Sequence, residues 1–353
     1  MRYSTPLKLS SSRQSSRLNV SAVLRARLRP MEGTRTFWNR LAHIGLLIAL
    51  AGAAWVGATV VAADPRASIA VLYPDMEEPY RSVFTQIITG VEKETGTPVN
   101  SYPIGPGHNP QELSNRLQQR DVRIVITLGR SGLSAATGLK KEVGIIAGGI
   151  LSAPAQSPQN LSVLSLAPDP ALLFKQLKAL APGIKRVLVV HDPQQNAWLM
   201  QLAREAASAQ GLDLQIREAS DLKSALQTYK TLLAEANPKL DALWLPQDST
   251  TVEESTILPL ILQEAWSHGL LFFSSSVVHV KRGALFALYP DNEGLGRRLA
   301  SSALKQLSGT SQSPAALSPL RDVLLAVNIR TASHLGLDLS DSRYKFDMIF
   351  PAP

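Results

Sequence analysis

From Arg66 onward, short apolar runs alternate with amphipathic stretches. Most of the apolar runs are dense in Val, Ile and Leu and show no polar alternation, which predicts buried parallel strands. These runs are Ser68–Tyr73, Val122–Leu128, Gly144–Ala147, Arg186–His191, Asp213–Ile216, Asp241–Leu245, Leu270–Phe273 and Ala284–Leu288. Between them lie patterns with helical spacing, of which Asp221–Glu235 is the clearest because its leucines fall on one face. This alternation predicts doubly wound α/β structure.

Two breaks in the pattern indicate more than one sheet. Roughly ten strands exceed the usual size of a single sheet. The stretch Ser152–Asn160 is rich in Pro, Ser and Gln and precedes another apolar run, Leu161–Leu166; the stretch Ser308–Pro319 has the same composition and precedes Asp322–Asn328. We therefore predict two α/β lobes joined by several crossings, and we expect a ligand at the carboxyl ends of the strands, in the cleft between the lobes.

The segment before these elements predicts export. Leu41–Ala63 contains no formally charged residue and follows a basic stretch, and Val61-Ala62-Ala63 offers small residues before Asp64. Residues 1–63 are thus interpreted as a basic leader with a signal peptide. An uncleaved anchor in the inner membrane is the alternative, since 23 apolar residues can span a bilayer. Either interpretation places the remainder in the periplasm, and Met31 is an alternative start of translation.

The net charge of +8 lies in the leader. Residues 1–40 hold nine of the 36 basic residues and one of the 28 acidic residues, so the exported part is balanced. A nucleic-acid partner is not expected, because it would require a basic face. The chain contains no cysteine, which excludes a disulfide scaffold, thiol catalysis, thiolate zinc sites and a lipoprotein anchor.

Patterns typical of enzymes are scarce. Gly129–Leu133 has a serine after a strand, yet it lacks the second glycine of the nucleophile-elbow motif. No histidine pair beyond the leader has metal-ligand spacing, and His268 before Gly269 is expected to end a helix. No nucleotide-binding glycine motif is present. We predict no catalytic residue, no metal site and no cofactor.

Five strand ends lead into small polar residues that open helices. Backbone N–H groups and hydroxyls in such loops can hold a small polar ligand. Helix capping explains any one loop equally well, but five loops at one edge favour a binding function. The loops are Gly129–Ser131, His191–Asn196, Pro246–Thr251, Ser274–Ser276 and Tyr289–Asn292.

The run from Asp241 to Gly309, together with the export signal and two lobes, resembles the substrate-binding proteins of ABC transporters. The similarity is greatest to the branch whose tryptophan- and tyrosine-binding members have the type I periplasmic-binding fold. The tail Leu324–Leu339 resembles that branch's closing strand and short helix, with Asn328, Thr331 and Ala332 in an Asn-x-x-Thr-Ala pattern. The resemblance spans Ser68–Leu339 and is strongest over Lys185–Gly309.

The resemblance implies a specific organisation. The fold would consist of two doubly wound Rossmann-like lobes joined by a multi-crossing hinge. Residues 64–164 and 291–319 would form the first lobe, and residues 165–290 and 320–345 the second. A small-molecule ligand would select the closed form, which a transporter permease or a membrane sensor then recognises. We expect a monomer.

The resemblance also places ligand contacts in the loops after strands. The matching positions are Arg130, Ser131, Asn196, Asp248, Ser249, Ser275 and Asp291. Tyr73 is a further candidate, since it could stack on an apolar side chain. Arg130 suits a carboxylate, and Asp248 and Asp291 suit an ammonium group, so the expected ligand is neutral or zwitterionic and amino-acid-like. The loops Tyr73–Tyr80 and Gly148–Ile150 depart from the hydroxyl-rich runs of the family.

Three other functions fit parts of the pattern. A periplasmic sensor module would have the same fold as a transport protein. An exported enzyme is disfavoured because no set of nucleophile, base and orienting residue is recognisable. The effector domain of a cytoplasmic repressor shares the lobe design, but the export signal and the lack of a recognisable helix-turn-helix argue against it.

Overall fold

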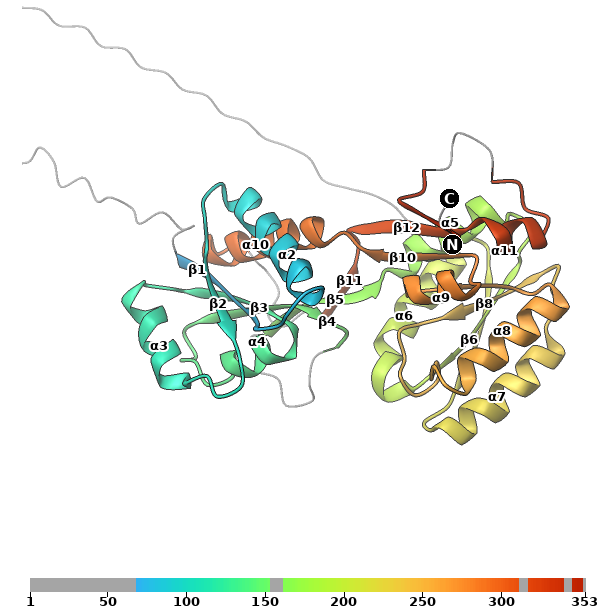
Figure 1. The fold of residues 1–353 in the computed structure, drawn as a ribbon, viewed down its shortest axis with the longest axis horizontal. Helices are drawn as coiled ribbons and strands as arrows, with labels where there is room; N and C mark the ends of the chain where they lie inside the picture. The colour runs from blue at the N-terminus through green and yellow to red at the C-terminus, as the bar shows by residue number, and fades with distance from the viewer. Residues whose placement is uncertain (1–67, 153–160, 311–316, 340–344, 352–353) are drawn as a thin grey trace, which may run out of the picture. The chain divides into compact units, whose positions relative to one another are not determined.

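The computed structural model describes residues 68–152, 161–310, 317–339 and 345–351 (Figure 1). The leader, with its predicted signal sequence, lies outside the described residues. Two separate sheets are present, each covered by helices on both faces, which confirms the predicted α/β class with two lobes. Within the described ranges, no helix is long and apolar enough to cross a membrane.

Sheet A is entirely parallel. Its helices α2 (Tyr80–Thr95) and α10 (Asn292–Leu307) cover one face, and α3 (Pro110–Gln119) and α4 (Gly129–Ala136) cover the other. The strands lie in the order β11 (Leu317–Leu320), β5 (Leu161–Pro168), β4 (Gly144–Ile150), β3 (Ile124–Leu128), β1 (Ile69–Pro74) and β2 (Asn100–Ile104).

Sheet B is parallel except where β12 runs antiparallel to β10. One face carries α5 (Pro170–Leu180), α6 (Pro193–Ala209) and α11 (Ile329–His334); the other carries α7 (Leu222–Glu235), α8 (Ile257–His268) and α9 (Val277–Arg282). The strands lie in the order β13 (Met348–Phe350), β12 (Val323–Asn328), β10 (Phe286–Pro290), β9 (Leu271–Ser274), β8 (Asp241–Leu245), β6 (Arg186–His191) and β7 (Asp213–Glu218).

The predicted strands all exist, and β6 and β8 have the predicted bounds. Strands β2, β11 and β13 were not predicted, and each of them lies at an edge of its sheet. Strand β2 alternates between exposed and less exposed residues and contains Pro103, and β11 contains Pro319, so neither shows a buried apolar run. The predicted break over Ser308–Pro319 is accordingly wrong in its last residues, which begin β11.

Helix ends follow the local sequence. Asp221 and Ser224 form a capping box at the start of α7, and the Asn328 side chain accepts a hydrogen bond from the Thr331 N–H (3.0 Å) at the start of α11. Helix α8 ends at His268, and Gly269 follows it in the left-handed conformation (φ 65°). Both the Asn-x-x-Thr-Ala start and the helix-ending place of His268 are therefore confirmed.

The chain crosses between the sheets three times. It passes from β5 to α5 at Asp169, from β10 to α10 at Asp291, and from β11 to β12 at residues 321–322. The Asp169 N–H donates to the Leu320 carbonyl (2.9 Å), and the Asp291 N–H donates to the Asp322 carbonyl (3.0 Å). The three crossings are thus linked to one another by backbone hydrogen bonds, and β5 remains in sheet A through Pro168.

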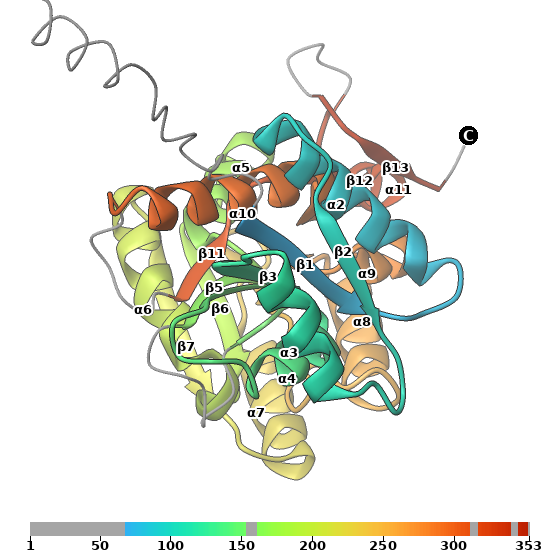
Figure 2. The same cartoon turned by 90° about the vertical axis from the view of Figure 1, so that its left-hand side faces the viewer.

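Helix α10 directly follows β10 of sheet B in the sequence but packs on sheet A beside α2 (Figure 2). The two helices touch through glycines. A Cβ atom at Gly296 would overlap the Ile87 carbonyl oxygen, and one at Gly90 would overlap the Glu293 carbonyl oxygen. Only glycine allows this approach of the two backbones.

Candidate functional site

The order of strands identifies two candidate half-sites. In sheet A, β1 has β2 on one side and β3 on the other; in sheet B, β6 has β7 on one side and β8 on the other. A doubly wound sheet opens a crevice at such a point, outside the carboxyl ends of the two central strands. The loops after β1 and β3 therefore form the sheet A half-site, and the loops after β6 and β8 form the sheet B half-site.

Asp248 is the centre of the sheet B half-site. One carboxylate oxygen accepts from the Asp192 N–H (2.7 Å) and the Asn196 amide (3.0 Å), and the other accepts from the N–H groups of Thr250 (3.1 Å) and Thr251 (2.9 Å). The side chain is buried, and these four donors occupy its acceptor positions. Asp248 thereby joins the loop after β6 to the loop after β8.

Gln195 makes a second connection between the same loops. Its amide nitrogen donates to Asp192 (3.0 Å) and to the Thr250 hydroxyl (2.8 Å), and its amide oxygen accepts from the Ser249 hydroxyl (3.3 Å). Thr250 also donates to Asp192 (2.9 Å). Burial acts to raise the pKa of Asp192, but hydrogen bonds from Gln194, Gln195 and Thr250 outweigh burial and hold this pKa below its usual value.

Ser275 adjoins this network at the end of β9. Its hydroxyl accepts from the indole N–H of Trp244 (3.3 Å), and its carbonyl accepts from the Gln247 amide (2.8 Å). The preceding Ser274 lies 2.7 Å from Nδ1 of His279, and burial lowers the pKa of that histidine. This pair is no nucleophile with its base, because Ser274 has no exposed surface through which a substrate could reach it.

The sheet A half-site is built differently, by close packing of backbone. A Cβ atom at Gly129 would lie 3.1 Å from Cγ of Pro74, and one at Gly149 would lie 3.0 Å from the backbone nitrogen of Gly129. Both glycines have positive φ (65° and 70°). The carboxyl ends of β1, β3 and β4 consequently meet at one place.

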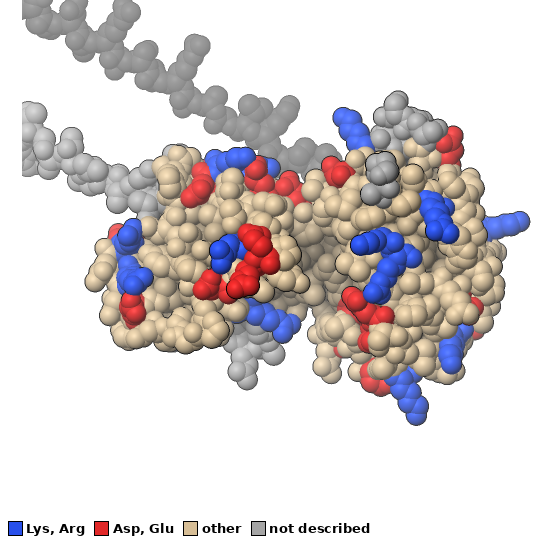
Figure 3. All heavy atoms as spheres, viewed as in Figure 1, with Lys and Arg blue, Asp and Glu red and all other residues tan. Residues whose placement is uncertain are grey.

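The side chains of this half-site are free. Arg130 and Ser131 lie in the first turn of α4 and are exposed, and within the described chain neither side chain has a hydrogen-bond or ion-pair partner. Tyr73 is half-buried against Phe84, with 6.5 Å between ring centres. On the face shown in Figure 3, basic and acidic side chains are interspersed, so no single charge dominates the surface in view.

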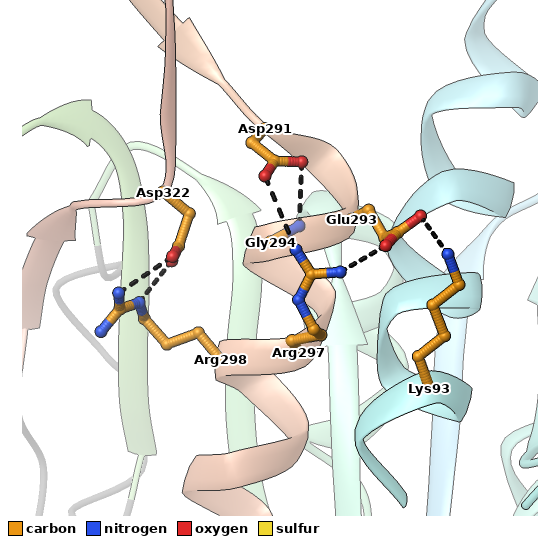
Figure 4. Close-up of polar contacts among 7 residues, drawn as sticks. All are labelled: Lys93, Asp291, Glu293, Gly294, Arg297, Arg298 and Asp322. Atoms are coloured by element: carbon orange, nitrogen blue, oxygen red, sulfur yellow. Dashed lines mark hydrogen bonds and ion pairs between the residues drawn. The ribbon is translucent and has the colours of Figure 1, made fainter. Parts of the chain in front are cut away.

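Asp291 lies at the second crossing. Its carboxylate accepts from the Gly294 N–H (3.0 Å) at the start of α10 and lies 3.8 Å from Arg297 (Figure 4). Next to it, Asp322 of the third crossing forms a bidentate pair with Arg298. Asp291 thus caps a helix in the hinge, apart from the Asp248 network, and its predicted contact with ligand stays a prediction.

The structure brings together most of the predicted residues. Asn196, Asp248 and Ser249 share one network, which Ser275 joins through Gln247; Tyr73, Arg130 and Ser131 lie at the ends of neighbouring strands. Gln195, Gln247 and Thr250 link the loops and were not predicted as site residues. They lie in the same helix-opening turns as the predicted residues, and this position could have identified them. In the described part of the chain, no group of acidic residues and histidines forms a metal site.

Comparison with known proteins identifies a family. Residues 143–345 match the family model of the ABC transporter substrate binding proteins. No curated protein matches the chain. A solved, ligand-free open structure of a substrate-binding protein with adhesive properties from Clostridium difficile is 19% identical, with a TM-score of 0.55, over 80% of this chain and 99% of that one. An ABC domain from Streptococcus pneumonia in complex with L-Trp is 15% identical, with a TM-score of 0.49, over 80% and 98% of the two chains.

Proposed function

The chain belongs to the family of ABC transporter substrate-binding proteins, with a type I periplasmic-binding fold, and we propose that it captures a small amino-acid-like ligand between its lobes for delivery to an ABC transporter. The observation that carries this proposal is the pair of half-sites. Each sheet offers polar loops at its switch point, where ligands of such folds bind.

The free groups of the two half-sites suit a zwitterion. Arg130 in the sheet A half-site is exposed and unpaired in the described chain, so its guanidinium can bind a carboxylate bidentately. In the sheet B half-site, Oδ1 of Asn196 and Oε1 of Gln247 accept no hydrogen bond from any described residue. We assign the ammonium group to these amide oxygens, because the acceptor positions of Asp248 are already occupied. Asp248 then shapes the site by fixing Asn196.

Capture would proceed by closure about the three crossings. Their backbone hydrogen bonds, from Asp169 to Leu320 and from Asp291 to Asp322, join the crossings into one unit about which the lobes can rotate. A ligand that contacts both half-sites stabilises the closed form through that differential contact. Small-angle scattering should give a smaller radius of gyration with ligand than without it, and an unchanged radius at saturation would exclude closure.

The test begins with the natural ligand. Protein purified from the periplasm should release an amino-acid-like compound on denaturation, identified by mass spectrometry, and thermal-shift screening should favour amino acids over sugars and purines. Arg130→Ala should then weaken binding at least about tenfold, because a carboxylate loses its charged partner. Arg116→Ala, which removes an exposed arginine of α3 paired with Glu112, is the matched control and should bind normally. A response to sugars or purines only would overturn the proposal.

The periplasmic location is a proposal from the leader. Amino-terminal sequencing of the periplasmic fraction should begin at or near Asp64. Recovery of the full-length chain from membranes alone would establish the anchor instead.

A further inference from the structure

A continuous groove runs along the amino-terminal edge of sheet B, at the opposite ends of the strands from the sheet B half-site. It consists of three adjoining hollows of about 600, 150 and 610 Å³. The first two share His334 and Leu335, and the last two share Trp266, Arg282, Gly283 and Thr331. The segments before β6, β8, β9 and β10 and the ends of β12 and β13 contribute to it. We call it the edge groove.

An aromatic pair forms the centre of the edge groove. The rings of Trp266 and His334 stack with 3.9 Å between centres and 6° between planes, and the Arg330 guanidinium lies 5.7 Å from the Trp266 ring centre. Trp266 nevertheless remains 43% exposed, and Ile329, which precedes Arg330 in the sequence, is equally exposed. Exposed apolar side chains around a hollow mark interaction surfaces, because isolated soluble proteins seldom leave such patches uncovered.

The charges that line the edge groove have one sign. Lys239, Lys281, Arg282 and Arg330 line it, and none of the described Asp or Glu residues does. Of these cations, Arg282 has a carboxylate nearby, Glu254 at 3.7 Å, but that residue lies outside the lining. Among the described residues, the groove thus combines apolar hollows with cations of which only Arg282 has a carboxylate within 4 Å, and this favours an occupant that is both apolar and acidic.

Shape and charge select among occupants. The same groove of a second copy would set cations against cations, which is unfavourable. The surface of a lipid bilayer can neutralise cations but does not insert side chains into separate hollows, whereas a protein segment can. We propose that the edge groove docks an acidic segment of a partner protein, with aromatic or aliphatic side chains beside Trp266 and carboxylates paired with Lys281, Arg282 and Arg330.

Docking at this edge leaves the ligand loops uncovered. The half-site residues Asn196 and Asp248 follow the carboxyl ends of β6 and β8, whereas the groove lies at the amino ends of the same sheet. A partner in the edge groove and a ligand at the half-sites therefore do not compete for the same atoms. Failure of the docking proposal would leave the proposed function intact, and ligand affinity distinguishes the two.

The first test selects random 12-residue displayed peptides on the full exported chain. Peptides that bind should be rich in Asp and Glu with an aromatic or aliphatic residue, and the best of them should bind the Lys281→Glu, Arg330→Glu variant at least about tenfold more weakly. Trp266→Ala should weaken the binding of the same peptide, while the affinity for the small-molecule ligand at the half-sites stays unchanged. The control, Lys223→Glu with Lys230→Glu on α7, reverses the same number of exposed charges and should bind as the parent does. Selection of neutral or basic peptides would overturn the proposal. Equal peptide affinity of the groove variant and the α7 control variant would also overturn it.

The second test identifies the occupant in cells. A photo-crosslinking amino acid at Ile329 should attach to an acidic segment of another protein, located by mass spectrometry of the linked peptide. The same amino acid at Leu222, which is equally exposed (43%), is the control. Docking of an acidic partner would be refuted by crosslinks to lipid, to a second copy or to a basic segment. It would also be refuted if the crosslinking yield at Ile329 were no higher than at Leu222.

Discussion

The two half-sites reach a defined geometry by opposite means. In sheet B, buried polar side chains join the loops: Asp248 accepts four hydrogen bonds, and Gln195 makes three more. In sheet A, the strand ends meet because Gly129 leaves room for the ring of Pro74 and Gly149 leaves room for the backbone of Gly129. One half depends on particular donors and acceptors, and the other depends on the absence of side chains.

This difference predicts separate roles for the two lobes in ligand binding. The sheet B network holds Asn196 and Gln247 in place before any ligand arrives, and such preorganisation lowers the cost of binding. Arg130 and Ser131 of the sheet A half-site have no partner among the described residues and are free to adjust to the ligand. We therefore expect the lobe of sheet B to fix the position of the ligand. The exposed side chains of the sheet A half-site should then complete its enclosure.

The largest effect should come from crowding the backbone of the sheet A half-site. A Cβ atom at Gly132 would lie 2.6 Å from the Leu72 carbonyl oxygen. Gly132→Ala must push α4 away from β1, and it should lower the free energy of unfolding by about 3 kcal/mol. Gly138→Ala is the control, since its Cβ would meet nothing within 4 Å. Equal urea midpoints for the two variants would show that close packing does not hold this half together.

The next effect tests the polar half. Asp248→Ala leaves the donors of Asp192, Asn196, Thr250 and Thr251 without their acceptor, and it should lower the free energy of unfolding by about 2 kcal/mol. Asp248→Asn should restore little of this loss, because one end of the amide is itself a donor. Asp213→Ala, at an exposed position, is the control. Chemical denaturation measures the stability of both variants. If ligand affinity falls while stability is unchanged, Asp248 contacts the ligand directly, as the sequence analysis had suggested.

A smaller effect should depend on pH and involve sheet B alone. Burial lowers the pKa of His279 from its usual 6.5, with Glu254 acting to raise it and Arg282 to lower it. The unfolded chain therefore takes up this proton first, so the stability contributed by the neutral histidine is complete above pH 6.5 and decreases as the pH falls below it. Between pH 6.5 and 5.5 we expect the free energy of unfolding to fall by no more than about 1 kcal/mol, because at most one extra proton binds to the unfolded chain. His279→Asn should lack this component, and an identical pH profile for the variant would exclude it.

The smallest change in stability is expected at Ser249. A substitution there distinguishes contact with the ligand from support of the Asp248 network. The Ser249 hydroxyl is exposed, and among the described residues it donates only to Gln195 (3.3 Å). Ser249→Ala should alter the free energy of unfolding by less than about 0.5 kcal/mol. Ligand affinity measured by calorimetry should still decrease a few fold. A stability loss as large as that of Asp248→Ala would place Ser249 inside the structural network instead.

The interior strands and several helix ends were determined by the sequence itself. Strands β6 and β8 are continuous apolar runs because both faces of a parallel sheet are covered, and that pattern is visible without any partner. Caps such as Asp221 and Asn328 bond to residues within the next turn, so they too are local. The positions of the candidate loops, directly after strands, follow from these same local signals.

Only the tertiary structure decided how those loops are connected. Asp248 meets the Asp192 N–H across 56 positions of sequence, and no periodicity encodes such a partner. The edge strands β2, β11 and β13 gain their conformation by pairing with a neighbour, since their own residues are half-exposed or include proline. The return of α10 to sheet A likewise depends on Gly90 and Gly296 meeting across the fold. The burial pattern of an element can be recognised in its own sequence, whereas its partner at a distant position is determined only when the sheets assemble.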